Sequence, residues 1–237
     1  MKKLNLLLTG LLVAGGMMFT SCTKEDNPAV TPSDPTPTVD ERINQVIPDD
    51  LREKVEEYIT IYDGVNPPNV EGVYRLDPEV LVKSTLSYDY AGQTFTPQYH
   101  RYYNQDMKKN TIDMLYVTDG ENEWMKGSGA FICGYDDKFT IYFNSYGQNG
   151  SVTFKMAIVV SGSKTDAGIA DLSWAFVMVE KGEDPYGDVV PVGTIRSFKD
   201  SDGLSDNAEW PYGNKYDALA RTRAAITNSI SSFVKAK

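Results

Sequence analysis

The sequence has little of the residue types that build catalytic and metal sites. Its 237 residues include two cysteines and one histidine, His100. Two cysteines are too few for a disulfide scaffold or for a zinc site of four thiolates, and one histidine excludes a metal-binding histidine pair. We find no phosphate-binding glycine loop and no nucleophile elbow. These absences predict a protein that is not an enzyme and that, calcium apart, uses no cofactor.

Positive charge is scarce as well. Lys and Arg number 23 against 33 Asp and Glu, which gives a formal net charge of −10. An acidic chain repels phosphate backbones, so we expect no nucleic-acid partner.

The apolar run at residues 4–19 spans 16 residues, short of the roughly 20 that a bilayer-spanning helix needs. With 24% charged and 41% hydrophobic residues, the composition is otherwise that of a globular domain.

Residues 1–21 have the form of a targeting segment. Lys2 and Lys3 precede the apolar run, which ends at Phe19-Thr20-Ser21-Cys22. This ending resembles the lipobox of bacterial lipoproteins, in the Bacteroidetes variant that has Ser before the cysteine. The resemblance implies that cleavage exposes Cys22 and that acylation of its sulfur anchors the chain to a membrane. The alternative is a plain secretory signal peptide with an incidental cysteine.

Residues 22–39 are predicted to be the acylated cysteine and a disordered tether. Four prolines lie among Thr, Ser and Asp, and such a stretch cannot bury enough apolar surface to order itself. Residues 23–27, Thr-Lys-Glu-Asp-Asn, resemble the export signal of surface lipoproteins in Bacteroidetes. The resemblance implies an outer-membrane lipoprotein exposed on the cell surface, and the alternative is an anchor that faces the periplasm.

Two segments have the apolar spacing of helices. An N-terminal helix is predicted within residues 40–66, where Asp49 and Asp50 precede an apolar face of Leu51, Val55, Tyr58, Ile59 and Tyr62. A C-terminal helix is predicted within residues 206–237, with an apolar face of Leu219, Ile226, Ile230 and Phe233. We expect both helices to pack outside the domain between them.

Residues 67–205 alternate apolar and polar side chains with the period of β-strands. Asp119-Gly120 and Asn149-Gly150 mark hairpin turns between such runs. We expect an all-β fold with strands near 70–76, 80–90, 94–104, 110–118, 122–133, 138–145, 151–161, 168–180 and 191–199. Short turns make sequence neighbours pair, so the strands should form an antiparallel meander that closes into a barrel of 8–10 strands. The predicted inward side chains are Ile112, Met114, Tyr116, Phe139, Ile141, Phe143, Phe154, Met156, Ile158, Trp174, Phe176 and Met178.

The start of this domain reads Gly72-Val73-Tyr74, a glycine followed by an aromatic residue on the first strand. With the meander and the C-terminal helix, it resembles the lipocalin and calycin plan, and residues 67–205 resemble the lipocalin-like lipoproteins of Bacteroidetes. The resemblance implies a lipocalin-like barrel in which Arg196 packs over the Tyr74 ring. It also implies a binding protein for a small apolar, aromatic or glycan-derived ligand.

The interior of an eight-stranded barrel is either filled by side chains or holds one small ligand. The predicted ligand-binding residues are Met114, Tyr116, Phe154, Met156, Trp174 and Phe176. In the alternative, these rings meet in the middle. The protein would then be a structural or accessory surface lipoprotein whose filled barrel contacts a protein or polysaccharide partner.

Other residues carry weaker patterns. Asp200, Asp202, Asp206 and Glu209 fall at positions three, five, nine and twelve of a calcium loop, but its first position would be Phe198. An acidic turn is the alternative to calcium binding. Alternation places His100 on the face opposite Tyr99 and Arg101. We interpret Cys133 as a small buried hydrophobe, and we interpret Glu121, Glu123, Asp136 and Asp137 as solvated turn acids.

Overall fold

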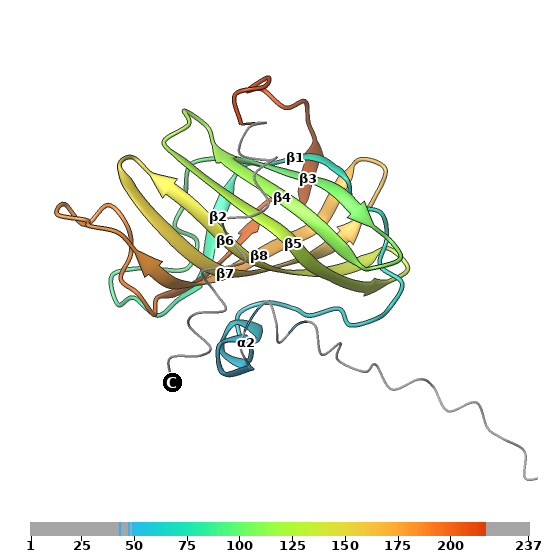
Figure 1. The fold of residues 1–237 in the computed structure, drawn as a ribbon, viewed down its shortest axis with the longest axis horizontal. Coiled ribbons are helices and arrows are strands. Elements are labelled where there is room, and N and C mark those ends of the chain that lie inside the picture. The colour runs from blue at the N-terminus through green and yellow to red at the C-terminus, as the bar shows by residue number, and fades with distance from the viewer. Residues whose placement is uncertain (1–42, 44–46, 48, 217–237) are drawn as a thin grey trace, which may run out of the picture. The chain divides into compact units, whose positions relative to one another are not determined.

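The structure is a computed structural model that describes residues 43, 47 and 49–216 (Figure 1). These residues all belong to one compact unit, Pro37–Lys237. The predicted signal peptide, Cys22, the tether and the apolar face of the C-terminal helix lie outside the described residues. No helix among the described residues is long and apolar enough to cross a membrane.

The described chain is mostly antiparallel β-sheet, as the alternation predicts. Helix α2 (Asp49–Glu56) precedes the sheet. The strands are β1 (Gly72–Leu76), β2 (Glu79–Ser84), β3 (Gln98–Asp106), β4 (Thr111–Thr118), β5 (Glu123–Tyr135), β6 (Lys138–Asn149), β7 (Val152–Lys164), β8 (Gly168–Lys181), β9 (Ile195–Asp200) and β10 (Leu204–Asn207).

The strand order is β10-β1-β3-β4-β5-β6-β7-β8-β9-β2, with a further pairing between β10 and β8. Strand β8 divides one edge between two partners, because Gly168–Ala170 pairs with β10 and Ser173–Val177 pairs with β9. The pairings therefore form a partial ring, in which β10 bridges β1 and β8 while β9 and β2 continue from the rest of β8. The colours of Figure 1 show the late strands returning to β1.

The predicted meander is confirmed from β3 to β9, where every strand pairs with the next. It is wrong for β2, which pairs with β9 instead of β1 or β3. Pro78 has no N–H to donate to a continuing ladder, so the chain leaves β1 there. Strand β10 was not expected, and it occupies residues assigned to the end of the barrel and the start of the C-terminal helix. Its polar sequence Leu-Ser-Asp-Asn lacks alternation, and backbone pairing with β1 and β8 holds it.

The predicted N-terminal helix is shorter than expected: α2 ends at Glu56, whereas the predicted apolar face continued to Tyr62. The chain beyond it is extended and lies along β5 and β6. The Gly134 N–H donates to the Gly64 carbonyl, and the Gly134 carbonyl accepts from the Asn66 N–H, both over 3.1 Å. A Cβ on Gly64 would lie 2.3 Å from the Gly134 oxygen. Tyr62 N–H donates to Thr140 Oγ1 over 2.7 Å. These partners exist only in the folded sheet, so tertiary contact overrides the helical spacing of Tyr58 to Tyr62.

The two faces of the sheet carry separate apolar clusters. All twelve predicted inward side chains are buried in the larger cluster, which confirms the alternation reading. The second cluster joins Ile43, Ile47 and Val55 to the opposite face, which includes Tyr142, Val159 and Val177. Figure 1 shows α2 against this side of the sheet. Cys133 is 3% exposed within the second cluster, as expected for a small buried hydrophobe.

Candidate functional site

A cavity of about 300 Å³ lies on the inner side of the sheet. Its wall includes the ends of β4 and β6, the starts of β5, β7 and β9, and the β8–β9 connection. It therefore lies at the end of the strands where the β4–β5, β6–β7 and β8–β9 connections meet. The polar lining residues are Glu79, Thr96, Thr118, Glu123, Asn149, Asp188 and Arg196.

Five of the six predicted ligand-binding residues lie on this wall: Tyr116, Phe154, Met156, Trp174 and Phe176. Met114 does not, because it is fully buried in the apolar cluster. The other half of the interior is filled, with Phe143 stacked on Tyr102 at a ring separation of 6.5 Å. A Cβ on Gly127 would lie 2.5 Å from the Phe143 ring, so this glycine makes room for the ring.

The register of the strands brings the aromatic side chains of the cavity wall into contact. Trp174 is the cross-strand partner of Phe198, and their rings stack with centroids 4.7 Å apart. Phe176 stacks on Trp174 at 5.7 Å, two residues along the same face of β8. Phe95 meets Phe198 edge to face at 5.0 Å. Offset and edge-to-face contacts of this kind stabilise the wall as a unit and leave ring surface toward the cavity.

Glu79 is a carboxyl that the sequence did not single out. It begins β2, is 3% exposed, and its Oε1 accepts a 2.8 Å hydrogen bond from Trp174 Nε1. Burial raises the pKa of Glu79 to about 8, and the charges of Glu123 and Asp200 act in the same direction. The hydrogen bond from Trp174 opposes this shift but does not cancel it. At neutral pH this side chain is therefore mostly a neutral acid facing the cavity.

The interpretation of Glu123 as a solvated turn acid is wrong. Glu123 Oε1 accepts from the Tyr116 hydroxyl at 3.2 Å, and its Oε2 accepts from Asn149 Nδ2 at 3.0 Å. Burial raises the pKa of Glu123, although both hydrogen bonds and the charge of Arg196 act to lower it. Glu121, two residues earlier, bonds instead to Tyr216 at 2.8 Å. Parity was the available signal, because Glu123 shares a strand face with buried Met125.

His100 lies in the core, and its hydrogen-bond partners among the described residues are neutral side chains. Its Nε2 lies 3.1 Å from Gln98 Oε1, and its Nδ1 lies 2.9 Å from the Tyr102 hydroxyl. Burial lowers the pKa of His100 to about 3, so the ring is neutral at ordinary pH. The predicted alternation is confirmed here, since His100 and Tyr102 are buried while Tyr99 and Arg101 are partly exposed. The ring acts as a buried hydrogen-bonding group.

The predicted signature residues do not all meet. Tyr74 is buried, and its hydroxyl donates to the Val70 carbonyl at 3.0 Å. A Cβ on Gly72 would lie 2.8 Å from that hydroxyl, which explains the glycine. The expected packing of Arg196 over Tyr74 is wrong: Lys164 Nζ lies 5.6 Å from the Tyr74 ring centroid, and the Arg196 guanidinium lies 5.5 Å from that of Phe95. Arg196 is on β9, which pairs with β8 and β2 but not with β1.

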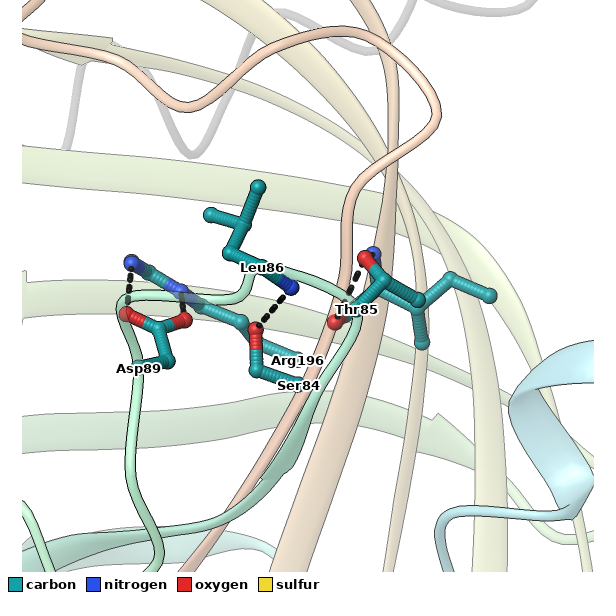
Figure 2. Close-up of polar contacts among 6 residues, drawn as sticks. Ser84, Thr85, Leu86, Asp89 and Arg196 are labelled. Carbon is teal, nitrogen blue, oxygen red and sulfur yellow. Dashed lines mark hydrogen bonds and ion pairs between the residues drawn. The ribbon is translucent and has the colours of Figure 1, made fainter.

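Arg196 instead fixes the connection between β2 and β3 (Figure 2). Its Nε and Nη2 donate to the two Asp89 oxygens at 2.7 and 2.8 Å. Burial acts to raise the pKa of Asp89, but the hydrogen bonds from Arg196 and Ser84 and the guanidinium charge outweigh it and lower the pKa. Ser84 Oγ also accepts from the Leu86 N–H at 3.0 Å. The result is a loop held beside the cavity by a buried, bidentate ion pair.

We expect Asp89→Asn to destabilise the fold by about 2–4 kcal/mol, because it leaves Arg196 buried without its counter-charge. Urea denaturation measures this loss, and amide hydrogen exchange should quicken in residues 85–92. Asp119→Asn is the matched control. Its pair with Arg75 is 38% and 39% exposed, so the change should cost less than about 1 kcal/mol. Equal losses in the two variants would contradict a special role for the Asp89 pair.

The four residues of the calcium prediction are not gathered into a site. Asp200 is 2% exposed and accepts from Ser205 Oγ at 2.9 Å. Asp202 accepts from the Leu204 N–H at 3.0 Å, and Asp206 is exposed in β10. Within the described part of the chain, no group of three or more His, Cys, Asp or Glu side chains could hold a metal ion.

Comparison of the chain with protein-family models, curated proteins and solved structures finds no match. The cavity wall combines stacked rings with the buried carboxyl of Glu79 and the partly buried carboxyl of Glu123, and the described residues place no His or Cys on it. Such a wall can enclose a small molecule and orient it through a few polar contacts.

Proposed function

We propose that the protein binds a small molecule inside a lipocalin-like barrel. The observation that carries the proposal is the cavity of about 300 Å³ walled by Tyr116, Phe154, Met156, Trp174 and Phe176. Ligand sites are concave, mostly apolar, about 300–1,000 Å³ in volume, and contain a few placed polar groups. The cavity falls at the small end of that range, so we expect a compact ligand with an apolar or aromatic body.

The bridging of β1 and β8 by β10 supports the barrel. So does the burial of all twelve inward side chains in one cluster. An eight-stranded barrel has room for one small ligand when part of its interior is unfilled. Here the half around Met114 and Phe143 is packed, and the half at the β8–β9 connection holds the cavity.

For its location, we propose an outer-membrane lipoprotein anchored through Cys22 and exposed on the cell surface. The lipobox-like ending at Cys22 and the proline-rich residues 22–39 support this location.

The packed half of the interior favours a second candidate function. In that case the domain is a structural or accessory module whose connections contact a protein or polysaccharide partner.

Native mass spectrometry of the chain incubated with an extract of the producing cells tests the first function. We expect a reproducible added mass on the wild-type protein. Met156→Trp should abolish it, because the larger indole fills the cavity that Met156 lines. Met107→Trp is the matched control, since Met107 is 49% exposed and away from the cavity, and it should keep the added mass.

Two results would contradict ligand binding in the cavity. A bare protein mass in every extract would favour the structural function. An added mass that persists in a folded Met156→Trp variant would place the ligand elsewhere. Thermal melting of both variants shows whether they fold.

A further inference from the structure

The cavity wall has polar groups that a general apolar pocket lacks, and they indicate a class of ligand. This inference rests on the proposed function. Glu79 receives its hydrogen bond from the neutral indole of Trp174, and Glu123 receives its bonds from neutral Tyr116 and Asn149. Among the described residues, no Lys or Arg forms an ion pair with either carboxyl. Each carboxyl therefore lacks the direct ion-pair partner that a buried carboxylate requires.

Arg196 acts through its charge to lower the pKa of Glu123, but it forms no direct ion pair with either carboxyl. It is the only Lys or Arg on the cavity wall within the described residues, and both Asp89 oxygens bind it. The two side chains of this pair are 13% and 1% exposed. Figure 2 shows the guanidinium turned toward Asp89. Asp188 adds a further acid to the wall. Once the Asp89 pair is counted as neutral, the wall has no unpaired positive charge among the described residues.

The apolar part of the wall suits a cation as well. Trp174, Phe176 and Phe198 are stacked, and Tyr116 lies 6.0 Å from Trp174. Aromatic faces attract a desolvated cation, most strongly when the ring is Trp. An anion would meet two carboxyls and ring faces of the same sign, and it would find Arg196 already paired.

We propose that the cavity binds an organic cation, a small amine with an apolar or aromatic body. The ammonium group is bound by Glu123 and by Glu79, whose proton is released to solvent when the cation supplies a counter-charge. The apolar body lies against Trp174 and Phe176. The ammonium supplies the counter-charge that the wall lacks, and the rings exclude water from the ion pair. Selectivity for a cation thus comes from the carboxyls, while the rings set the size of the body.

Three probes of similar shape and different charge test the proposal: phenethylamine, phenethyl alcohol and phenylacetate. Isothermal titration calorimetry with the wild-type chain measures their affinities. Phenethylamine should bind at least about tenfold more tightly than phenethyl alcohol, since hydrogen bonds to charged groups are the stronger kind. Phenylacetate should bind most weakly of the three.

Glu79→Gln and Glu123→Gln should each weaken phenethylamine by about tenfold and change phenethyl alcohol by less than about twofold. Glu180→Gln is the matched control, because Glu180 pairs with Lys155 away from the cavity, and it should change neither. The two cavity variants are independent, so one that fails to fold leaves the other to decide.

Phenethylamine that binds no more tightly than phenethyl alcohol overturns the proposal, and so does the absence of binding by all three probes. Binding as a function is judged separately, by the added mass from cell extract. An extracted ligand without a basic nitrogen, lost in Met156→Trp, would keep the binding function and remove the amine.

Discussion

Glu79→Gln is expected to stabilise the protein by about 3–5 kcal/mol above pH 8 and to change its stability little below pH 4.5. The wild-type carboxyl has its pKa raised by burial from 4.5 to about 8. Between these values the folded chain holds a proton that the unfolded chain has released. The contribution of the neutral Glu79 carboxyl to the stability of the fold is therefore complete below pH 4.5 and is lost as the pH rises through 8. Glutamine never ionises, and its amide oxygen can still accept from Trp174 Nε1.

Urea denaturation at a series of pH values measures this effect as the difference between variant and wild type. The difference should grow by about 1.4 kcal/mol per pH unit between pH 4.5 and 8. Titrating groups that do not interact with Glu79 occur in both proteins and cancel, whereas Glu123 and Asp200 act on Glu79 and contribute to the difference. A difference that stays constant across this range would mean that Glu79 is ionised in the folded protein.

His100→Gln is expected to remove a comparable sensitivity to acid. Burial lowers the pKa of His100 from 6.5 to about 3. Between these values the unfolded chain binds a proton that the folded chain does not. The contribution of the neutral ring is thus present above pH 6.5 and is lost as the pH falls toward 3. Relative to wild type, the free energy of unfolding of the variant should rise by about 1.4 kcal/mol for each unit that the pH falls within this interval.

The two groups act in opposite directions where their ranges overlap. Between pH 4.5 and 6.5, acidification stabilises the fold through Glu79 and destabilises it through His100, so their slopes cancel. The variants should unmask the two slopes with opposite signs. Their guanidine or urea midpoints at pH 5 and pH 6 provide the most direct comparison. Parallel stability curves for His100→Gln and wild type would show that the ring is protonated in the folded state.

The strand faces could be predicted because alternation is local. Whether Phe154 and Trp174 point inward follows from parity along each strand, and the structure buries both in one cluster. The same parity applied to acids would have marked Glu79, which shares a face with Leu81. A charged side chain on an inner face is expensive and the sequence shows no partner for Glu79, so sequence alone does not predict a buried acid there.

The arginine contact shows the opposite case. Arg196 and Asp89 are 107 positions apart, and nothing in either neighbourhood indicates the other. The expected contact with Tyr74 assumed an arrangement taken from a resemblance. In the structure Lys164 lies over that ring, while β9 carries Arg196 to the β2–β3 connection.

The sequence by itself determined the class of fold, the number and approximate bounds of the long strands, and which side chains face the core. These properties depend on period-two alternation and on Asp-Gly and Asn-Gly turns, which act within a few residues. Only the tertiary structure decided that β2 pairs with β9, that β10 bridges β1 and β8, and that Glu79 and Glu123 share one cavity. Those outcomes depend on strand ends far apart in the chain, where backbone pairing selects the partner and side-chain pattern does not.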